Sequence, residues 1–378
     1  MLKLGMVGAN GQVGAELCLL LAAREDIELV AICRNRSGSS FLRWQGIACR
    51  HGRVADPTDA ARLLSDCDVV VNSSLASGTP VEIRRIEAQI IRNVFEYSKA
   101  AATIIHFSTQ SVYGDPRPGR WIRWRNPYGR AKLTTERRVR VESRRTKKPA
   151  HIFRLGHVCG SLQEISNTIR TEVRTGTVFL PAQNCSSNTV YTAAIIGAIE
   201  QILAGKSQAG TYDLMNSPRW SWREVYEYEA GVCNLPLEAH LVDSVSDSRK
   251  FAVAAPALRM AGELVAAQPV RDLLAKVFAH MPSSMNARAM AWWYAKRARL
   301  QIAALNRSRA IPEHLSWVEN GKHFFPADTP TIDLLRSLSQ KHRASNASGP
   351  WPIDLPDASS RALQHTLVGG DSSVIDSR

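Results

Sequence analysis

The stretch MVGANGQVGAEL, residues 6–17, places three glycines between a short apolar run and a segment of helical spacing. Gly8, Gly11 and Gly14 stand at G-x-x-G-x-x-G spacing. In a dinucleotide site such glycines permit a sharp turn, close approach of backbone amides to the pyrophosphate, and tight packing of helix on sheet. The N–H groups of the helix N-terminus then face the phosphates. A tight turn without a ligand is disfavoured, because the flanking strand and helix that the site requires are both present.

Short apolar runs rich in β-branched residues alternate with segments of helical spacing over the first 160 residues. The apolar runs are 2–8, 27–33, 68–72, 103–108 and 150–156, and the helical segments are 12–24, 80–101 and 127–145. Strands that alternate with helices of this length predict βαβ units and a parallel sheet. The expected fold class is therefore α/β, a Rossmann-type doubly wound parallel sheet.

The chain of 378 residues is long enough for more than one domain, because a single core stops growing near ~250–300 residues. We expect a dinucleotide-binding Rossmann domain at 1–160 and a smaller substrate-binding, mainly helical region at 161–335, part of which can return to the sheet. Residues 336–378 are rich in Ser, Pro, Asp and Gly and are expected to form a flexible tail.

Several helices are expected beyond residue 160. The segment 190–205 predicts a helix that ends at Gly205, and Ser221 with Glu224 forms a capping box at the start of another. Two more helical stretches are expected near 257–280 and 286–306.

Cysteine usage and hydropathy indicate the compartment. The seven cysteines are scattered without a C-x-x-C pair, which indicates reduced thiols, no disulfide framework and no metal site. The first apolar run is too short for a signal peptide, and no run approaches the ~20 residues that cross a bilayer. We expect a cytoplasmic protein without a transmembrane segment.

The formal net charge of +14 is concentrated between residues 117 and 148, which hold thirteen Lys or Arg residues against Glu136 and Glu142. A solvated basic face is the favoured interpretation, and attraction of an anionic substrate is the alternative. Specific nucleic-acid binding is not expected, because no recognition motif accompanies the charge.

The sequence after the second expected strand bears on cofactor choice. A carboxylate there would bind the ribose hydroxyls of NAD, but the chain has CRNRSG at 33–38, with Arg34 and Arg36. Guanidinium groups suit a 2′-phosphate, so NADP is favoured and NAD stays an alternative. These arginines could instead simply face solvent.

A second group of residues has catalytic chemistry. Tyr128 and Lys132 are four residues apart and share a face of the helix that begins near Asn126-Pro127. An ammonium near a phenol is expected to lower the tyrosine pKa, so that the tyrosine can exchange a proton with a carbinol or carbonyl oxygen. Thr109, at the end of the strand in HFSTQSVYGD (106–115), could hydrogen-bond to the same oxygen.

Taken in order, these motifs resemble the extended short-chain dehydrogenase/reductases, in particular the NAD(P)-dependent epimerase/dehydratase group that acts on nucleotide sugars. The matching pieces are GANGQVG, ADPTD, DVVVN, FSTQSVYGD, NPYGRAK, RLGHVCG and GTYDL, and they cover roughly residues 1–230. The resemblance implies that Thr109, Tyr128 and Lys132 form the catalytic triad. It also implies that Asp56 lies near the adenine, and that Gln12 and Val13 offer backbone to the pyrophosphate.

The chain departs from that group on the substrate side. Gln110 and Ser111 stand where dehydratases of the group carry an acidic pair, which disfavours water elimination. His157 replaces an asparagine usual in the group, and we interpret it as a packing residue rather than an acid or base.

The leading hypothesis is an NAD(P)-dependent oxidoreductase or epimerase that acts on a sugar carbinol or ketone, with a nucleotide-linked substrate. The alternatives are an NADPH-dependent reductase of a non-sugar ketone and a nonenzymatic dinucleotide-sensing protein. In many members of the group that the chain resembles, the helices that correspond to 80–101 and 127–145 form a dimer bundle, so the resemblance leaves a homodimer open. The arginines of the second helix would crowd that interface.

Overall fold

The computed structural model describes residues 1–113, 127–176, 178–181, 187–215, 220–242, 283–307, 318–319 and 322–323. The helix expected at 257–280 and the tail expected at 336–378 lie outside these residues.

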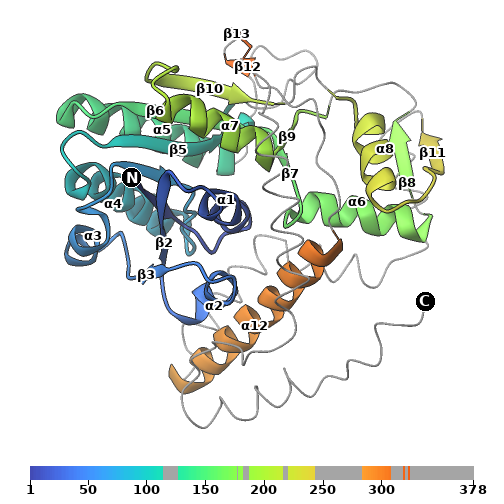
Figure 1. The fold of residues 1–378 in the computed structure, drawn as a ribbon, viewed down its shortest axis with the longest axis horizontal. Helices are drawn as coiled ribbons and strands as arrows, with labels where there is room; N and C mark the ends of the chain where they lie inside the picture. The colour runs from blue at the N-terminus through green and yellow to red at the C-terminus, as the bar shows by residue number, and fades with distance from the viewer. Residues whose placement is uncertain are drawn as a thin grey trace.

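A parallel sheet of seven strands forms the centre of the structure (Figure 1). Its strand order is β10-β6-β5-β4-β1-β2-β3. The strands are β1 Leu2–Val7, β2 Ile27–Cys33, β3 Cys49–His51, β4 Val69–Asn72, β5 Thr103–Thr109, β6 Ala150–Leu155 and β10 Gly210–Leu214. Five of these match the runs expected from sequence, and every neighbouring pair is parallel. The doubly wound α/β fold is confirmed.

Helices cover both faces of this sheet, and the strand residues alternate between two hydrophobic cores. In β4, Val69 and Val71 face one core while Val70 faces the other, as the two-residue period of a strand requires. The first core lies under α1 and α7, and the second lies under α3, α4 and α5. The bounds are α1 Gln12–Ala22, α3 Pro57–Leu64, α4 Pro80–Tyr97, α5 Pro127–Thr146 and α7 Thr192–Leu203.

Local signals fix where several helices begin and end. Asp56 caps α3, and Thr79 with Glu82 forms a capping box on α4. The predicted capping box of Ser221 and Glu224 opens α8 (Trp222–Val232). Gly205 has a φ of +68° shortly after α7 ends, which confirms its role as a helix stop.

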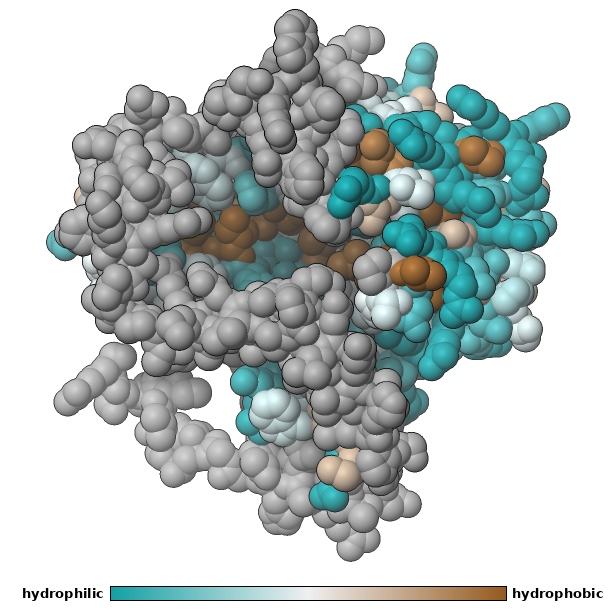
Figure 2. All heavy atoms as spheres, turned by 180° about the vertical axis from the view of Figure 1, so that it is seen from behind, coloured by the Kyte–Doolittle hydropathy of each residue, from teal (hydrophilic) through white to brown (hydrophobic). Residues whose placement is uncertain are grey.

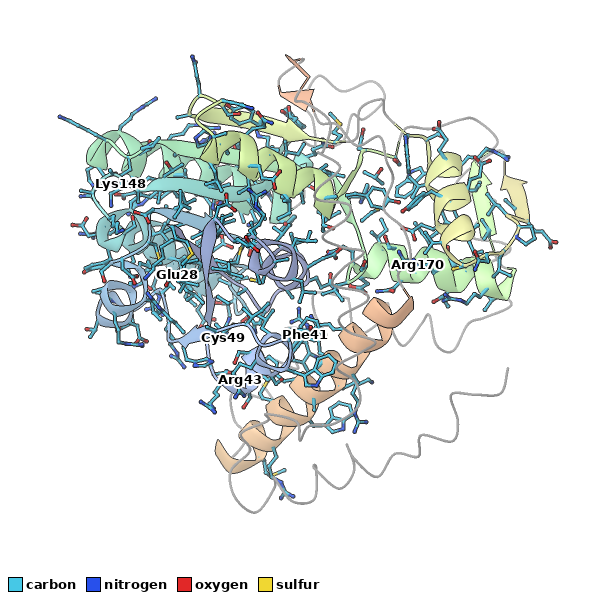
Figure 3. All side chains as sticks on the ribbon, in the orientation of Figure 1. Glu28, Phe41, Arg43, Cys49, Lys148 and Arg170 are labelled. Carbon is cyan, nitrogen blue, oxygen red and sulfur yellow. The ribbon has the colours of Figure 1, made fainter. Side chains whose placement is uncertain are left out.

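A second lobe lies beside the carboxyl ends of the strands (Figure 1). It contains α6 (Glu164–Thr175) packed on α8, with β8 (Val178–Pro181) paired to β11 (Ala239–Val242). A buried ion pair of 2.6 Å between Arg170 and Glu229 joins the two helices, and Figure 3 shows Arg170 within this lobe. Two further short strands, β7 (His157–Cys159) and β9 (Thr189–Tyr191), connect the lobe to the sheet.

The remaining elements include one long helix and one short hairpin. Helix α12 (Ser283–Arg307) contains the helix expected at 286–306 and packs beneath η1 (Ser37–Ser39) and α2 (Ser40–Trp44). Strands β12 (Val318–Glu319) and β13 (Lys322–His323) pair antiparallel. Among the helices of the described ranges, none combines the length and apolar character needed to cross a bilayer.

The basic charge of α5 is partly paired by two buried glutamates of the same helix. Glu142 lies 2.7 Å from Arg145 and 3.3 Å from Arg138, while Glu136 lies 2.9 Å from Arg140. Figure 2, which views the molecule from behind, shows mainly hydrophilic side chains on the side that carries α4 and α5. This agrees with the interpretation of the basic run as a solvated face, for the part of it that the structure describes.

Candidate active site

The glycine loop joins β1 to α1 in the conformation that its sequence predicts. Gly8 has a φ of +83°, and a Cβ there would lie 2.8 Å from the Ser74 backbone, beyond the end of β4. The N–H of Gly11 donates to the carbonyl oxygen of Gly8 at 2.8 Å, and a Cβ on Gly14 would clash with the same oxygen. The loop therefore excludes side chains at Gly8 and Gly14.

The start of α1 suits an anion. Gly11 is its N-cap and supplies no side-chain oxygen to the first turn, where Gln12 and Val13 lie. These first-turn N–H groups lie at the carboxyl edge of the sheet, at the point where the strand order reverses between β1 and β4. Ligands of doubly wound sheets bind at this crevice, and the helix N-terminus favours phosphate.

A buried carboxylate that sequence reasoning missed anchors α1 to the second lobe. Glu16 is 1% exposed and accepts hydrogen bonds from the N–H groups of Ser161 and Leu162 at 2.8 and 2.9 Å. Nε2 of Gln163 and the hydroxyl of Thr192 also donate to it, both at 2.7 Å. Four donors from distant segments thus position the helix that begins at the glycine loop.

Arg34 follows the end of β2, and Asp56 precedes α3. Arg34 follows β2 directly, is exposed, and makes no ion pair with any described residue. Asp56 is exposed, and its Oδ1 accepts the N–H of Asp59 at 2.9 Å. Asp56 thus has a structural role as the cap of α3 beside any contact with an adenine.

Helix α5 brings Lys132 to the strand that carries Thr109. Lys132 is 6% exposed, and its Nζ donates to the carbonyl oxygen of Phe107 in β5 at 3.2 Å. Thr109 is the last residue of β5, and its Oγ1 accepts the N–H of Ser111 at 3.2 Å. The lysine and the threonine therefore share one strand end.

Tyr128 lies one helical turn before Lys132, and 45% of the residue is exposed. Within the described ranges, no hydrogen bond joins Tyr128 to Thr109 or Lys132. Burial of the phenol and the nearby Glu87 raise the pKa of Tyr128, whereas the sequence led us to expect a lowered pKa. The expectation of a lowered pKa was wrong. The ammonium of Lys132 is hydrogen-bonded to the carbonyl oxygen of Phe107, and Glu87 of α4 adds negative charge near the phenol.

The buried surroundings of Lys132 disfavour its charged form. Burial lowers the pKa of Lys132, and Glu87 and Glu136 oppose this shift. Burial also raises the pKa of Glu87, which is 6% exposed. Two buried groups of opposite charge thus lie behind the tyrosine, without a direct ion pair between them.

A second buried network supports β5 from below. Glu136 accepts a hydrogen bond from Ser108 at 2.7 Å and two from Arg154 of β6, at 2.9 and 2.7 Å. Arg140 donates to the same carboxylate at 2.9 Å. This network ties α5, β5 and β6 together directly beside Thr109, and sequence reasoning did not identify it.

Gln110 and His157, two positions at which the sequence departs from the group that it resembles, lie at or near β7. A Cβ on Gly156 would clash with the carbonyl oxygen of Asn188 and lie 3.6 Å from the Gln110 side-chain oxygen. His157 is exposed, and the centroid of its ring lies 5.3 Å from that of the Trp222 ring. Within the described residues, no group of three or more His, Cys, Asp or Glu side chains could hold a metal ion.

Comparison with known protein families gives the class of this site. Residues 5–178 match the model of the NAD dependent epimerase/dehydratase family. The match covers a little under half of the chain. The match confirms the resemblance seen in the sequence and places the epimerase/dehydratase segment among enzymes that depend on NAD. No curated protein sequence matches the chain.

Solved structures of similar fold come from nucleotide-sugar enzymes. The UDP-N-acetylglucosamine 4-epimerase of Bacillus cereus has a TM-score of 0.52 at 17% identity, over 65% of this chain and 88% of that chain. The UDP-glucuronic acid 4-epimerase of Bacillus cereus, in complex with UDP-glucuronic acid and NAD, has a TM-score of 0.51 at 18% identity, over 65% and 87%. A dTDP-glucose 4,6-dehydratase from Bacillus anthracis, in complex with NAD, has a TM-score of 0.51 at 15% identity, over 64% and 84%. These likenesses support the fold of the epimerase/dehydratase segment.

Proposed function

We propose that the protein transfers hydride at a carbinol or ketone of a nucleotide-linked sugar, as an epimerase or a reductase. The observation that carries the proposal is the hydrogen bond of 3.2 Å from Lys132 to Phe107. It brings Lys132 and the helix that bears Tyr128 to the strand end with Thr109, at the same edge of the sheet as the glycine loop.

A nicotinamide dinucleotide fits the residues present. The loop excludes side chains at Gly8 and Gly14, and no side chain caps α1, so the backbone of Gln12 and Val13 is free to approach a pyrophosphate. When bound, the dinucleotide supplies or accepts the hydride. The raised pKa of Tyr128 keeps its phenol protonated, ready to donate a proton to a carbonyl oxygen. In this proposal Thr109 orients that oxygen, and the cationic Lys132 stabilises the phenolate that forms.

Two features refine the proposed chemistry. Exposed Arg34 beyond β2 favours the 2′-phosphate of NADP, with NAD as the second candidate. Gln110 and Ser111 provide no acidic pair beside Thr109, so epimerisation or reduction is favoured over water elimination. The alternative of a nonenzymatic dinucleotide sensor gives no catalytic role to the buried Lys132 at the strand end that carries Thr109.

A homodimer through α4 and α5 is also proposed. A groove of about 290 Å³ lies between these helices, with apolar residues such as Ile91 and Val141 and a rim of Arg84, Arg137 and Arg138. Like charges would face each other across a two-fold interface, so the dimer should strengthen as salt screens them.

The test is turnover of Tyr128→Phe with UDP-N-acetylglucosamine and UDP-glucuronic acid as probe substrates and either cofactor. We expect kcat to fall by about 10²–10⁴-fold, the usual contribution of a positioned acid or base, with an unchanged Kd for the cofactor. Tyr97→Phe, at the end of α4, is the matched control and should keep full activity. Equal turnover of Tyr128→Phe and the unmodified protein would refute the proposed chemistry.

A further inference from the structure

Helix α12 lies outside the residues that match the family model, yet it packs against the cofactor half of the molecule. Its partners are η1 and α2, which directly follow β2 (Figure 1). Ala295 and Ala298 are 3% and 2% exposed, so small side chains let the helix approach closely. Figure 3 shows Phe41 of α2 at this contact. The C-terminal helix is thus a packed part of the dinucleotide-binding half.

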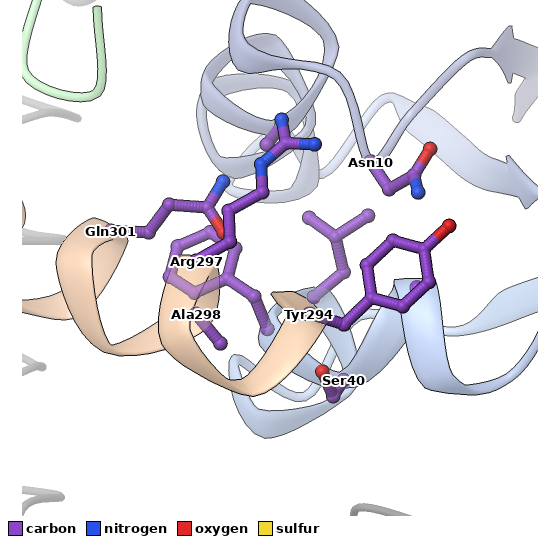
Figure 4. A pocket seen from close by; sticks show the side chains of 10 residues that line it. Asn10, Ser40, Tyr294, Arg297, Ala298 and Gln301 are labelled. Atoms are coloured by element: carbon purple, nitrogen blue, oxygen red, sulfur yellow. The ribbon is translucent and has the colours of Figure 1, made fainter. Parts of the chain in front are cut away.

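The contact converges on the glycine loop. A cavity of about 10 Å³, room for a single water molecule, lies between Asn10 of the loop and Tyr294 and Arg297 of α12 (Figure 4). Gly38 permits this approach, because a Cβ there would lie 2.8 Å from Asn10 Nδ2 and 3.3 Å from the Tyr294 ring. Three segments that are far apart in sequence therefore meet at one point beside the proposed cofactor site.

The guanidinium of Arg297 carries a positive charge that no described carboxylate pairs. Arg297 is half-buried, and its guanidinium lies 5.5 Å from the centroid of the Trp293 ring. No carboxylate of the described residues lies within ion-pair distance of Arg297. Burial lowers its pKa, as expected for a cation without a nearby anion. A half-buried guanidinium in this state is costly unless an anion accompanies it, and Arg34 adds more positive charge after β2.

We propose that Arg297 binds the 2′-phosphate of a phosphorylated dinucleotide, so that α12 completes the cofactor site from the C-terminal region. This rests on the proposed dinucleotide binding. Arg297 shares its cavity with Gly38 and Ser40, which follow β2, and in doubly wound folds the residues after the second strand are the ones that recognise the ribose 2′ position. The guanidinium fork matches phosphate geometry. Because the cavity has room for only one water molecule, Arg297 would hold the phosphate outside the cavity.

The experiment titrates NADPH and NADH into the full-length protein and follows cofactor fluorescence. Arg297→Gln should raise the Kd for NADPH at least about tenfold, which corresponds to about 1.4 kcal/mol, and change the Kd for NADH less than about twofold. Arg297→Lys keeps the charge and should recover part of the NADPH affinity. Arg288→Gln, an exposed arginine on the same helix, is the matched control and should leave both Kd values unchanged.

The ratio of the two Kd values separates the possible failures. An unchanged ratio in Arg297→Gln, or an equal loss of both cofactors, would overturn the phosphate role of Arg297 while dinucleotide binding stands. A native protein that prefers NADH would also overturn it. A native protein that binds neither cofactor would overturn the proposed function together with this inference. If Arg297→Gln lowers the melting temperature, the Lys variant and the Kd ratio still decide between these outcomes.

Discussion

Replacement of Glu16 by glutamine is expected to destabilise the protein and loosen the start of α1. The carboxylate is 1% exposed and accepts four hydrogen bonds, two on each oxygen. Glutamine keeps one oxygen, which can accept the hydrogen bonds from Leu162 and Gln163. Its NH₂ group replaces the other oxygen and cannot accept the N–H of Ser161. The hydroxyl of Thr192 can turn to accept, but the Ser161 N–H cannot.

The magnitude follows from these bonds. One buried N–H left without an acceptor costs about 1–3 kcal/mol, and the loss of charge weakens the hydrogen bonds that remain. The amide is easier to bury than the carboxylate, which offsets part of the loss. We expect the free energy of unfolding to fall by about 2–4 kcal/mol, the combined range for these effects.

Urea unfolding followed by tryptophan fluorescence measures this change. Glu25→Gln is the matched control, because Glu25 is exposed, and it should shift stability by less than about 0.5 kcal/mol. The Kd for the cofactor should rise in Glu16→Gln, since α1 positions the glycine loop. A stability change as small as that of the control would show that the Glu16 network does not hold the two lobes together.

Two further predictions concern the loop and a buried histidine. Gly14→Ala should abolish cofactor binding and lower the free energy of unfolding by about 1–3 kcal/mol, because its Cβ would clash with the Gly8 carbonyl oxygen. The control is Gly231→Ala in α8, which has open space around it and should be neutral or stabilising. Calorimetry and cofactor titration measure both, and a Gly14→Ala protein that binds normally would contradict the close-approach argument. Burial lowers the pKa of His106 to about 3, so below pH 6.5 the unfolded chain binds a proton that the folded protein excludes. Stability should therefore fall by about 1.4 kcal/mol per pH unit from this residue as the pH drops from 6.5 toward 3, and His106→Gln should remove that slope. Identical pH profiles of the two proteins would count against a buried neutral imidazole.

The parts of the fold that the sequence predicted depend on local patterns. The glycine loop is legible because backbone geometry excludes side chains at Gly8 and Gly14 whatever the rest of the chain does. The capping box of Ser221 and Glu224 is equally local, because both partners lie within four residues. The alternation of Val69, Val70 and Val71 between two cores made β4 recognisable as a buried strand.

The interactions that were missed join residues far apart in sequence. Glu16 meets donors 145 to 176 residues away, and no pattern near Glu16 marks it as buried. Arg154 reaches Glu136 only because α5 packs over β5 and β6. The direction of the Tyr128 pKa shift was predicted wrongly because it depends first on burial of the phenol and then on Glu87, which belongs to another helix.

Strand β10 is the last strand of the central sheet in chain order, and it covers one edge of that sheet. It pairs with β6 over Gly210–Leu214, yet the family match ends at residue 178. During synthesis on the ribosome, β6 therefore stays an open edge until some sixty further residues, counted from Leu155 to Leu214, have been made. Helix α6 and strand β8 of the second lobe are made within that interval, whereas α8 and β11 follow β10 in the chain. The complete central sheet therefore needs residues that lie beyond the segment matched by the family model.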